Sequence, residues 1–88
     1  MILLDVIKDI DSFDDDKTIY AKKPWTINSE ALVDFEPESG GNPETAEGFD
    51  YFIEVFLAIE FLEDAPKFLF SSVEKRCKRL IEYVIRDA

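Results

Sequence analysis

The sequence contains no histidine and only one cysteine in 88 residues. Histidine is the usual base for serine and cysteine nucleophiles and a common ligand of zinc and iron, so its absence argues against most hydrolytic and metal chemistry. The single cysteine, Cys77, rules out a disulfide within the chain and a cysteine-based metal cage. Because Cys77 shares an apolar helical stripe with Val73 and Leu80, we expect its thiol to be buried and unreactive. The single cysteine also indicates a reducing compartment. We therefore expect a protein that is not an enzyme and binds no cofactor or metal.

Apolar runs long enough to cross a membrane are also missing. The longest apolar stretch, residues 49–64, is interrupted by Asp50, Glu54 and Glu60, whereas a membrane span needs roughly 20 predominantly apolar residues. The first residues, Met-Ile-Leu-Leu-Asp, carry no basic segment, and their apolar run is too short for a signal peptide. We expect a cytoplasmic protein that does not contact membranes.

Basic residues are scarce: ten Lys and Arg stand against twenty Asp and Glu, for a net charge of −10. Residues 1–70 alone carry a balance of −12, and residues 71–88 a balance of +2. An acidic surface of this kind repels nucleic acid and attracts basic partners at long range. The basic residues at 75–79 spread around a helix and have no aromatic residues between them, so they do not form a nucleic-acid footprint. Acidity that serves only solubility is the alternative.

The aromatic residues are abundant, and residues 49–64 hold the longest apolar run. As a helix, this segment places a broad apolar stripe in the core, formed by Tyr51, Phe52, Val55, Phe56, Ile59 and Leu62. A second ridge of Ile53, Leu57 and Phe61 then lies among Asp50, Glu54 and Glu60. Strict alternation would also fit a strand. Because sixteen residues without Gly or Pro exceed a typical strand, the length favours a helix.

The remaining elements predict a small α+β fold in a single domain spanning residues 1–88. Apolar residues at helical spacing indicate a helix at residues 2–11. Two short strands are expected at residues 18–23 and 31–36, and the simplest pairing is an antiparallel hairpin packed on the helices. Ser71, followed three residues later by Glu74, predicts the start of a C-terminal amphipathic helix. The expected order is helix, strand, strand, helix, helix. Trp25, between the two strands, is expected to be partly buried.

Two segments are predicted to be loops. Asp14, Asp15 and Asp16 are consecutive like charges, which are unfavourable at the C-terminal end of a helix. Their region does not match a calcium-binding loop, because Phe13 and Asp14 occupy positions that need a ligand and a glycine. Residues 37–48 contain all three glycines and two of the four prolines. We expect this second, acidic loop to be mobile.

The runs YFIEVFLAIEFLED at residues 51–64 and EKRCKRLIEYVIRD at residues 74–87, in a short acidic α+β chain, resemble small bacterial immunity proteins. These belong to toxin–immunity systems, including contact-dependent growth inhibition. The resemblance covers the C-terminal half of the chain. It implies a protein that binds one cognate toxin domain, often a basic nuclease, and blocks its active site. No family binding residues carry over, because such families place their contacts differently.

We therefore predict a protein-binding module whose partner is a basic toxin domain. Charge would steer the encounter, and exposed apolar residues would supply affinity. The predicted contact residues lie in residues 49–64 and in the loop before the first strand: Asp50, Ile53, Glu54, Leu57, Glu60, Phe61, Asp14, Asp15 and Asp16. The alternative is an acidic regulatory adaptor or an obligate homodimer, because the same ridge could close a symmetric interface.

Overall fold

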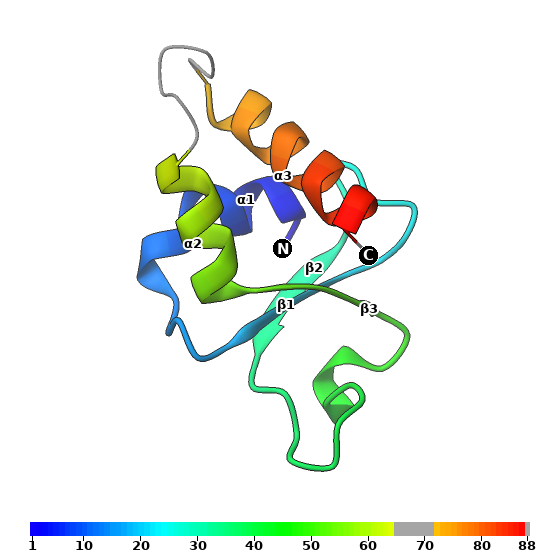
Figure 1. The fold of residues 1–88 in the computed structure, drawn as a ribbon. Helices are drawn as coiled ribbons and strands as arrows, with labels where there is room; N and C mark the ends of the chain where they lie inside the picture. The colour runs from blue at the N-terminus through cyan, green and yellow to red at the C-terminus, as the bar shows by residue number, and fades with distance from the viewer. Residues whose placement is uncertain (65–71, 88) are drawn as a thin grey trace.

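A three-stranded antiparallel sheet with the strand order β2–β1–β3 lies beside three helices (Figure 1). The computed structural model describes residues 1–64 and 72–87. The elements, in chain order, are α1 (Leu3–Lys8), the 3₁₀ turn η1 (Ile10–Ser12), β1 (Thr18–Ala21), β2 (Ala31–Asp34), the 3₁₀ turn η2 (Glu44–Ala46), β3 (Asp50–Glu54), α2 (Val55–Asp64) and α3 (Val73–Asp87). The predicted α+β class is confirmed, and so is the antiparallel pairing of the first two strands.

The prediction of a single helix over residues 49–64 is wrong for its first part. Residues 50–54 form β3, and the helix begins only at Val55. The Val55 N–H donates a hydrogen bond of 2.9 Å to the carbonyl of Lys17, which precedes β1, so backbone pairing continues up to the residue that starts the helix. A strand therefore passes directly into a helix inside one apolar run.

An irregularity in β3 explains why strict alternation also fails. Ile53 lies opposite Ile19 and Tyr51 lies opposite Tyr20, so Phe52 is an extra residue in a β-bulge. Both Phe52 and Ile53 are buried in the core, whereas Tyr51 is exposed. The bulge thus places two consecutive side chains on the core side of the sheet.

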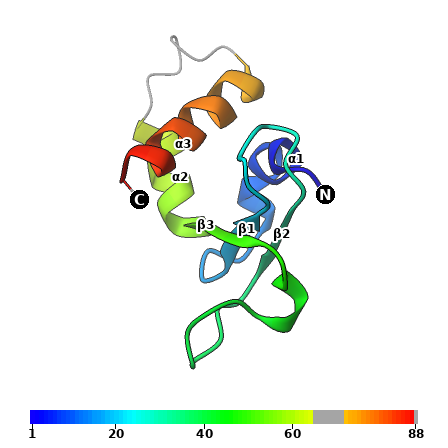
Figure 2. The same ribbon diagram turned by 90° about the vertical axis from the view of Figure 1, so that its right-hand side faces the viewer.

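One hydrophobic core joins all the helices and strands. Its buried members include Leu3 and Val6 of α1, Ile19 and Ala21 of β1, Ala31 of β2, Phe52 and Ile53 of β3, Val55, Ala58 and Leu62 of α2, and Cys77, Leu80, Ile81 and Val84 of α3. Figure 2 shows the three helices gathered above the sheet. Two residues of the apolar stripe expected for residues 49–64, Tyr51 in β3 and Phe56 in α2, depart from the prediction, because they are 45% and 42% exposed.

The opposite face of the sheet carries Tyr20, which is fully buried even though alternation turns it away from Ile19 and Ala21. The chain between β2 and β3 extends on this side, away from the helices (Figure 2). Within it, Ala46 of η2 is also fully buried, and the Thr45 hydroxyl donates a 2.6 Å hydrogen bond to the Asp34 carboxylate. Residues 37–48 therefore contain one packed turn, and their mobility stays a prediction.

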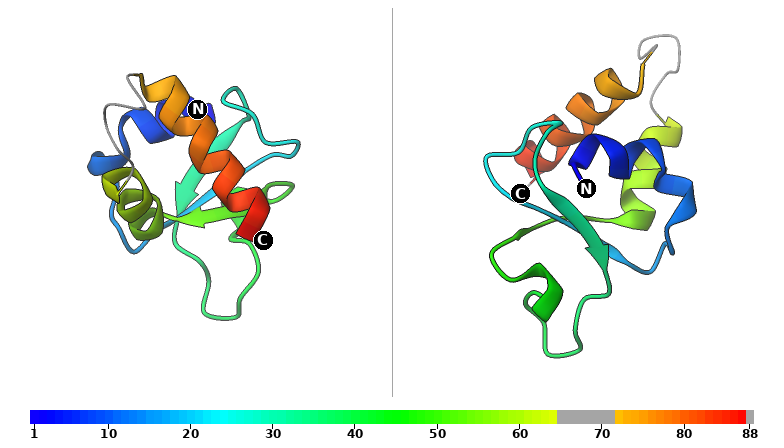
Figure 3. Two further views of the ribbon diagram at one scale, coloured as in Figure 1. Left: turned by 45° about the horizontal axis from the view of Figure 1, so that its top comes forward. Right: turned by 180° about the vertical axis from the view of Figure 1, so that it is seen from behind.

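Helix α3 is the element that agrees best with its prediction. Its buried residues Cys77, Leu80, Ile81 and Val84 belong to the expected apolar stripe, whereas Ile85, also expected there, is exposed. The Ser72 hydroxyl accepts a 3.2 Å hydrogen bond from the Lys75 N–H at the start of the helix. The predicted cap, Ser71, lies outside the described residues. Figure 3 shows α3 running from beside α1 to its C-terminal end near β3. No helix in residues 1–64 or 72–87 combines the length and apolar character needed to cross a membrane.

Candidate interaction surface

The predicted ridge of Ile53, Leu57 and Phe61 is covered mainly by the protein itself. Ile53 belongs to β3 and is only 6% exposed. Phe61 is half-buried, and its ring stacks on Tyr83 of α3 with centroids 4.8 Å apart. Leu57 remains 36% exposed. Helix α3 therefore covers part of the ridge, and Leu57 is its accessible member.

An open groove of about 340 Å³ lies where β3, the start of α2 and the end of α3 meet. We call it the β3–α3 groove. It is lined by Trp25, Tyr51, Phe52, Ile53, Leu57, Tyr83, Val84 and Asp87. Phe52, Ile53 and Val84 are buried and form an apolar floor, whereas the other lining residues are at least partly accessible. Among the described residues, the groove thus combines aromatic walls with one charged side chain, the carboxylate of Asp87.

Trp25 is held at one side of this groove by two interactions. Its indole N–H donates a 3.0 Å hydrogen bond to the Ala21 carbonyl, and its ring packs edge-to-face on Phe52 with centroids 5.0 Å apart. The Lys23 Nζ lies 5.0 Å from the centre of the Trp25 ring, in an adjoining hollow that Ile85 also lines. The predicted partial burial of Trp25 is confirmed. A fixed aromatic ring of this kind suits a contact surface.

Acidic side chains act on both tyrosines of the groove. The pKa of Tyr83 is raised, first by a hydrogen bond to Asp87 and then by the charge of Asp87, with a smaller effect from Glu60. Burial raises the pKa of Tyr51, and the charge of Glu54 adds to it. Two of the predicted acids, Glu54 and Glu60, therefore contribute negative potential at the groove.

Asp50 is also placed close by, as the first residue of β3 and the neighbour of Tyr51. Its carboxylate accepts a 3.4 Å hydrogen bond from the Lys23 N–H. Of these predicted residues, Leu57 lines the β3–α3 groove, Glu54 acts on Tyr51 of the groove, and Asp50 is bonded to Lys23 of the adjoining hollow.

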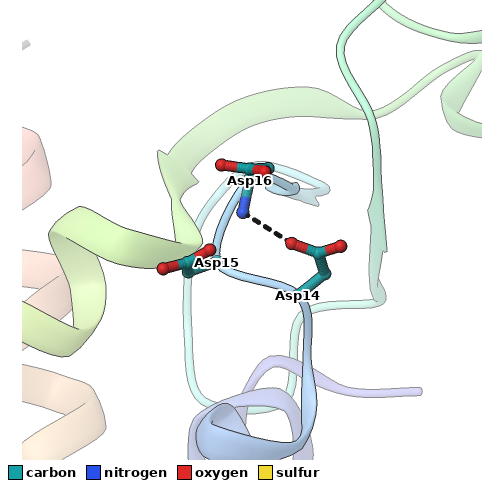
Figure 4. Close-up of side chains that lie close together, drawn as sticks. All are labelled: Asp14, Asp15 and Asp16. Carbon is teal, nitrogen blue, oxygen red and sulfur yellow. Dashed lines mark hydrogen bonds between the residues drawn. The ribbon is translucent and has the colours of Figure 1, made fainter.

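Asp14, Asp15 and Asp16 form a separate acidic loop between η1 and β1 (Figure 4). All three are exposed, their carboxylate oxygens lie within 4.8 Å of one another, and Asp14 Oδ1 accepts a 3.0 Å hydrogen bond from the Asp16 N–H. The carbonyl of the adjoining residue, Lys17, accepts a hydrogen bond from the Val55 N–H at the start of α2. Negative charge near a helix N-terminus is favourable.

The interior thiol offers no reactive group. Cys77 is fully buried, and burial raises its pKa to about 11. A thiol with so high a pKa stays protonated at neutral pH and is a poor nucleophile. The expectation of a buried thiol is confirmed.

Two groove residues, Tyr83 and Asp87, were not identified from the sequence. Tyr83 lies outside the apolar stripe of α3 that contains Cys77, Leu80 and Val84. An aromatic residue outside the stripe is the sequence feature from which a contact residue could have been inferred. Asp87 lies one turn further along the same helix face as Tyr83. Neither side chain could be paired with β3 before the position of that strand was known.

Comparison of the chain with protein-family models, with curated protein sequences and with solved structures found no match. The assignment of function therefore rests on the surface of the protein, above all on the β3–α3 groove and the acids around it.

Proposed function

We propose that the protein is an immunity-type binding module that neutralises a basic, nuclease-type toxin domain in the cytoplasm. The observation that carries the proposal is the β3–α3 groove, an aromatic-walled apolar hollow with negative charge at its border on a protein of net charge −10. A basic partner matches both properties.

The two parts of this surface would have different roles in binding. Glu54, Glu60 and Asp50 would raise the association rate of a positively charged partner, an effect that salt screens. Tyr51, Leu57 and the ring of Trp25 would supply the desolvated contacts from which most binding energy comes. Neutralisation requires only that the bound protein cover the partner's active site, so the absence of histidine from this chain is no obstacle.

The proposal predicts that a basic toxin protein is encoded beside this one. It is tested by coexpressing the two proteins and by measuring complex formation, loss of toxicity and association rate. Two triple variants change the charge equally. Asp50→Asn, Glu54→Gln and Glu60→Gln neutralise the groove side, whereas Asp14→Asn, Asp15→Asn and Asp16→Asn neutralise the acidic loop.

We expect the groove-side variant to associate several-fold more slowly and with weaker salt dependence, and the acidic-loop variant to change less. If the acidic-loop variant were the slower one, that loop would be the interface. If the neighbouring protein formed no complex and its toxicity were unaffected, the immunity proposal would be rejected.

The alternative of an obligate homodimer is distinguished by light scattering. The proposal predicts a monomer, because a groove that serves a basic partner must be open in the free protein. A stable dimer that Leu57→Lys dissociates would favour the alternative.

A further inference from the structure

We propose that the β3–α3 groove is a receptor for an arginine side chain of the basic partner. This inference rests on the proposed function for the partner, and it adds the chemical group that the groove recognises. It comes from the combination of aromatic walls, an apolar floor and one carboxylate in the same hollow.

The apolar floor suits the methylene stem of an arginine. Phe52, Ile53 and Val84 are buried members of the core at the base of the groove, with exposed fractions of 2%, 6% and 7%. The stem of a long basic side chain covers apolar surface of this kind while its charged head stays near the rim.

The aromatic walls suit the guanidinium group. Tyr51 and Tyr83 are 45% and 41% exposed, and the half-buried Trp25 also lines the groove. A guanidinium group stacks on aromatic faces and gains cation–π attraction there. The Trp25 ring already has a cation at 5.0 Å, the Nζ of Lys23. Lys23 belongs to the adjoining hollow and does not line the β3–α3 groove.

Asp87 supplies the matching charge. Among the described residues that line the groove it is the one ionised side chain, and its charge acts on the neighbouring Tyr83. Carboxylates bind guanidinium with two parallel hydrogen bonds, which an ammonium group cannot reproduce. An uncharged leucine or phenylalanine anchor would fill the floor but would leave the Asp87 carboxylate without an ion-pair partner. The groove therefore favours arginine over lysine and over apolar anchors.

The test uses the whole protein and small probes, so it needs no identified partner. The ¹⁵N-labelled protein is titrated with the N-acetyl, N-methylamide derivatives of arginine, citrulline, lysine and norleucine. Citrulline is the matched control, because it has nearly the shape of arginine without the charge. We expect the arginine probe to shift the Trp25 indole N–H and the amides of Tyr51 and Asp87, with citrulline binding about fivefold more weakly.

Two variants complete the design. Asp87→Asn should reduce the preference for arginine over citrulline to the part that the aromatic walls supply, whereas Asp14→Asn, which neutralises an exposed acid elsewhere, should keep it in full. The proposal is overturned if citrulline and norleucine shift the same resonances as strongly as arginine. It is also overturned if the arginine shifts centre on the acidic loop, or if Asp87→Asn changes nothing while the spectrum shows an intact fold.

Failure of this inference is distinguishable from failure of the proposed function. If the protein binds the arginine probe in the groove but forms no complex with the neighbouring basic protein, the arginine-receptor proposal stands and the immunity proposal fails. If the protein neutralises the neighbouring toxin but does not prefer the arginine probe, the immunity proposal stands and the arginine-receptor proposal fails.

Discussion

Phe61 of α2 and Tyr83 of α3 stack with their ring centroids 4.8 Å apart and their planes inclined by 30°. This pair connects the two helices at the edge of the core and supports one wall of the β3–α3 groove. The position of Tyr83 therefore depends on a residue that was expected to contact a partner.

The Phe61–Tyr83 pair should show a measurable coupling energy. In a double-mutant cycle with Phe61→Leu and Tyr83→Leu, we expect a coupling of about 0.5–1.5 kcal/mol, because aromatic pairs contribute this much beyond the area they bury. Urea unfolding measures it. Phe56→Leu, on an exposed residue of the same helix, should couple to Tyr83→Leu by less than about 0.5 kcal/mol. Equal coupling in the two cycles would show that the rings do not interact specifically.

Leu80 and Ile85 test the burial pattern of α3 as a matched pair of aliphatic residues. Leu80 is fully buried in the core, whereas Ile85 is 58% exposed. Leu80→Ala should lower the free energy of unfolding by about 2–5 kcal/mol, which could unfold so small a protein, and Ile85→Ala should change it by about 0.5 kcal/mol. Thermal unfolding followed by circular dichroism separates the two. A large loss for Ile85→Ala would place that side chain in the core.

The Cys77 thiol should react slowly while the protein is folded. Its pKa is raised by burial from 9.0 to about 11, so near pH 8 the thiolate fraction is about a hundredfold lower in the folded than in the unfolded chain. A thiol reagent such as Ellman's reagent should therefore react far faster in urea than in buffer. Fast reaction of the folded protein would contradict the burial of Cys77.

The same shift predicts how stability depends on alkaline pH. Below pH 9 the thiol is protonated in both states, and its contribution to stability is fully present. As pH rises from 9 towards 11, the unfolded thiol ionises and the folded one does not, so this contribution is lost. Cys77→Ala should reduce the decline in stability over this range, measured by urea unfolding against pH. The tyrosines, which titrate in the same range, are unchanged in that comparison.

The buried Tyr20 hydroxyl makes a further prediction. It has no hydrogen-bond partner among the described residues, and burial raises its pKa. Because removing an unsatisfied buried hydroxyl relieves a desolvation cost, Tyr20→Phe should leave stability unchanged or raise it by about 1 kcal/mol. The control is Tyr51→Phe, at an exposed position. A loss of more than about 1 kcal/mol would show that the hydroxyl is hydrogen-bonded, with Thr18 as the candidate partner.

The elements that were predicted correctly from the sequence are those in which apolar residues recur at one spacing from start to end. In α3, the expected stripe of Val73, Cys77, Leu80, Ile81, Val84 and Ile85 follows a helical spacing. Four of its six residues are buried, Val73 is partly buried, and Ile85, at 58% exposed, departs from the prediction. The β1–β2 hairpin was also predicted, because turn-forming residues separate two short apolar segments.

Residues 49–64 could not be divided into a strand and a helix from the sequence, because the spacing of their apolar residues changes without any change in composition. No Gly or Pro marks the passage from β3 to α2 at Val55, and the bulge at Phe52 removes strict alternation from the strand. Pairing with β1, a contact distant in sequence, decides that residues 50–54 are extended. The β3–α3 groove depends on the same long-range pairing, so its composition could not be read from local patterns.

Leu57 and Phe56 allow the groove itself to be tested against a matched neighbour. They are adjacent in α2 and similarly exposed, at 36% and 42%, but only Leu57 lines the groove. Leu57→Lys and Phe56→Lys add the same charge and remove a similar apolar surface. If the β3–α3 groove is the interface, Leu57→Lys should weaken binding to the basic partner at least about tenfold, as expected for a central contact. Phe56→Lys should have only the smaller effect of one added charge. Calorimetric titration measures both, and urea unfolding verifies that each variant is folded. Equal losses would indicate long-range repulsion alone, and the groove would then have no direct part in binding.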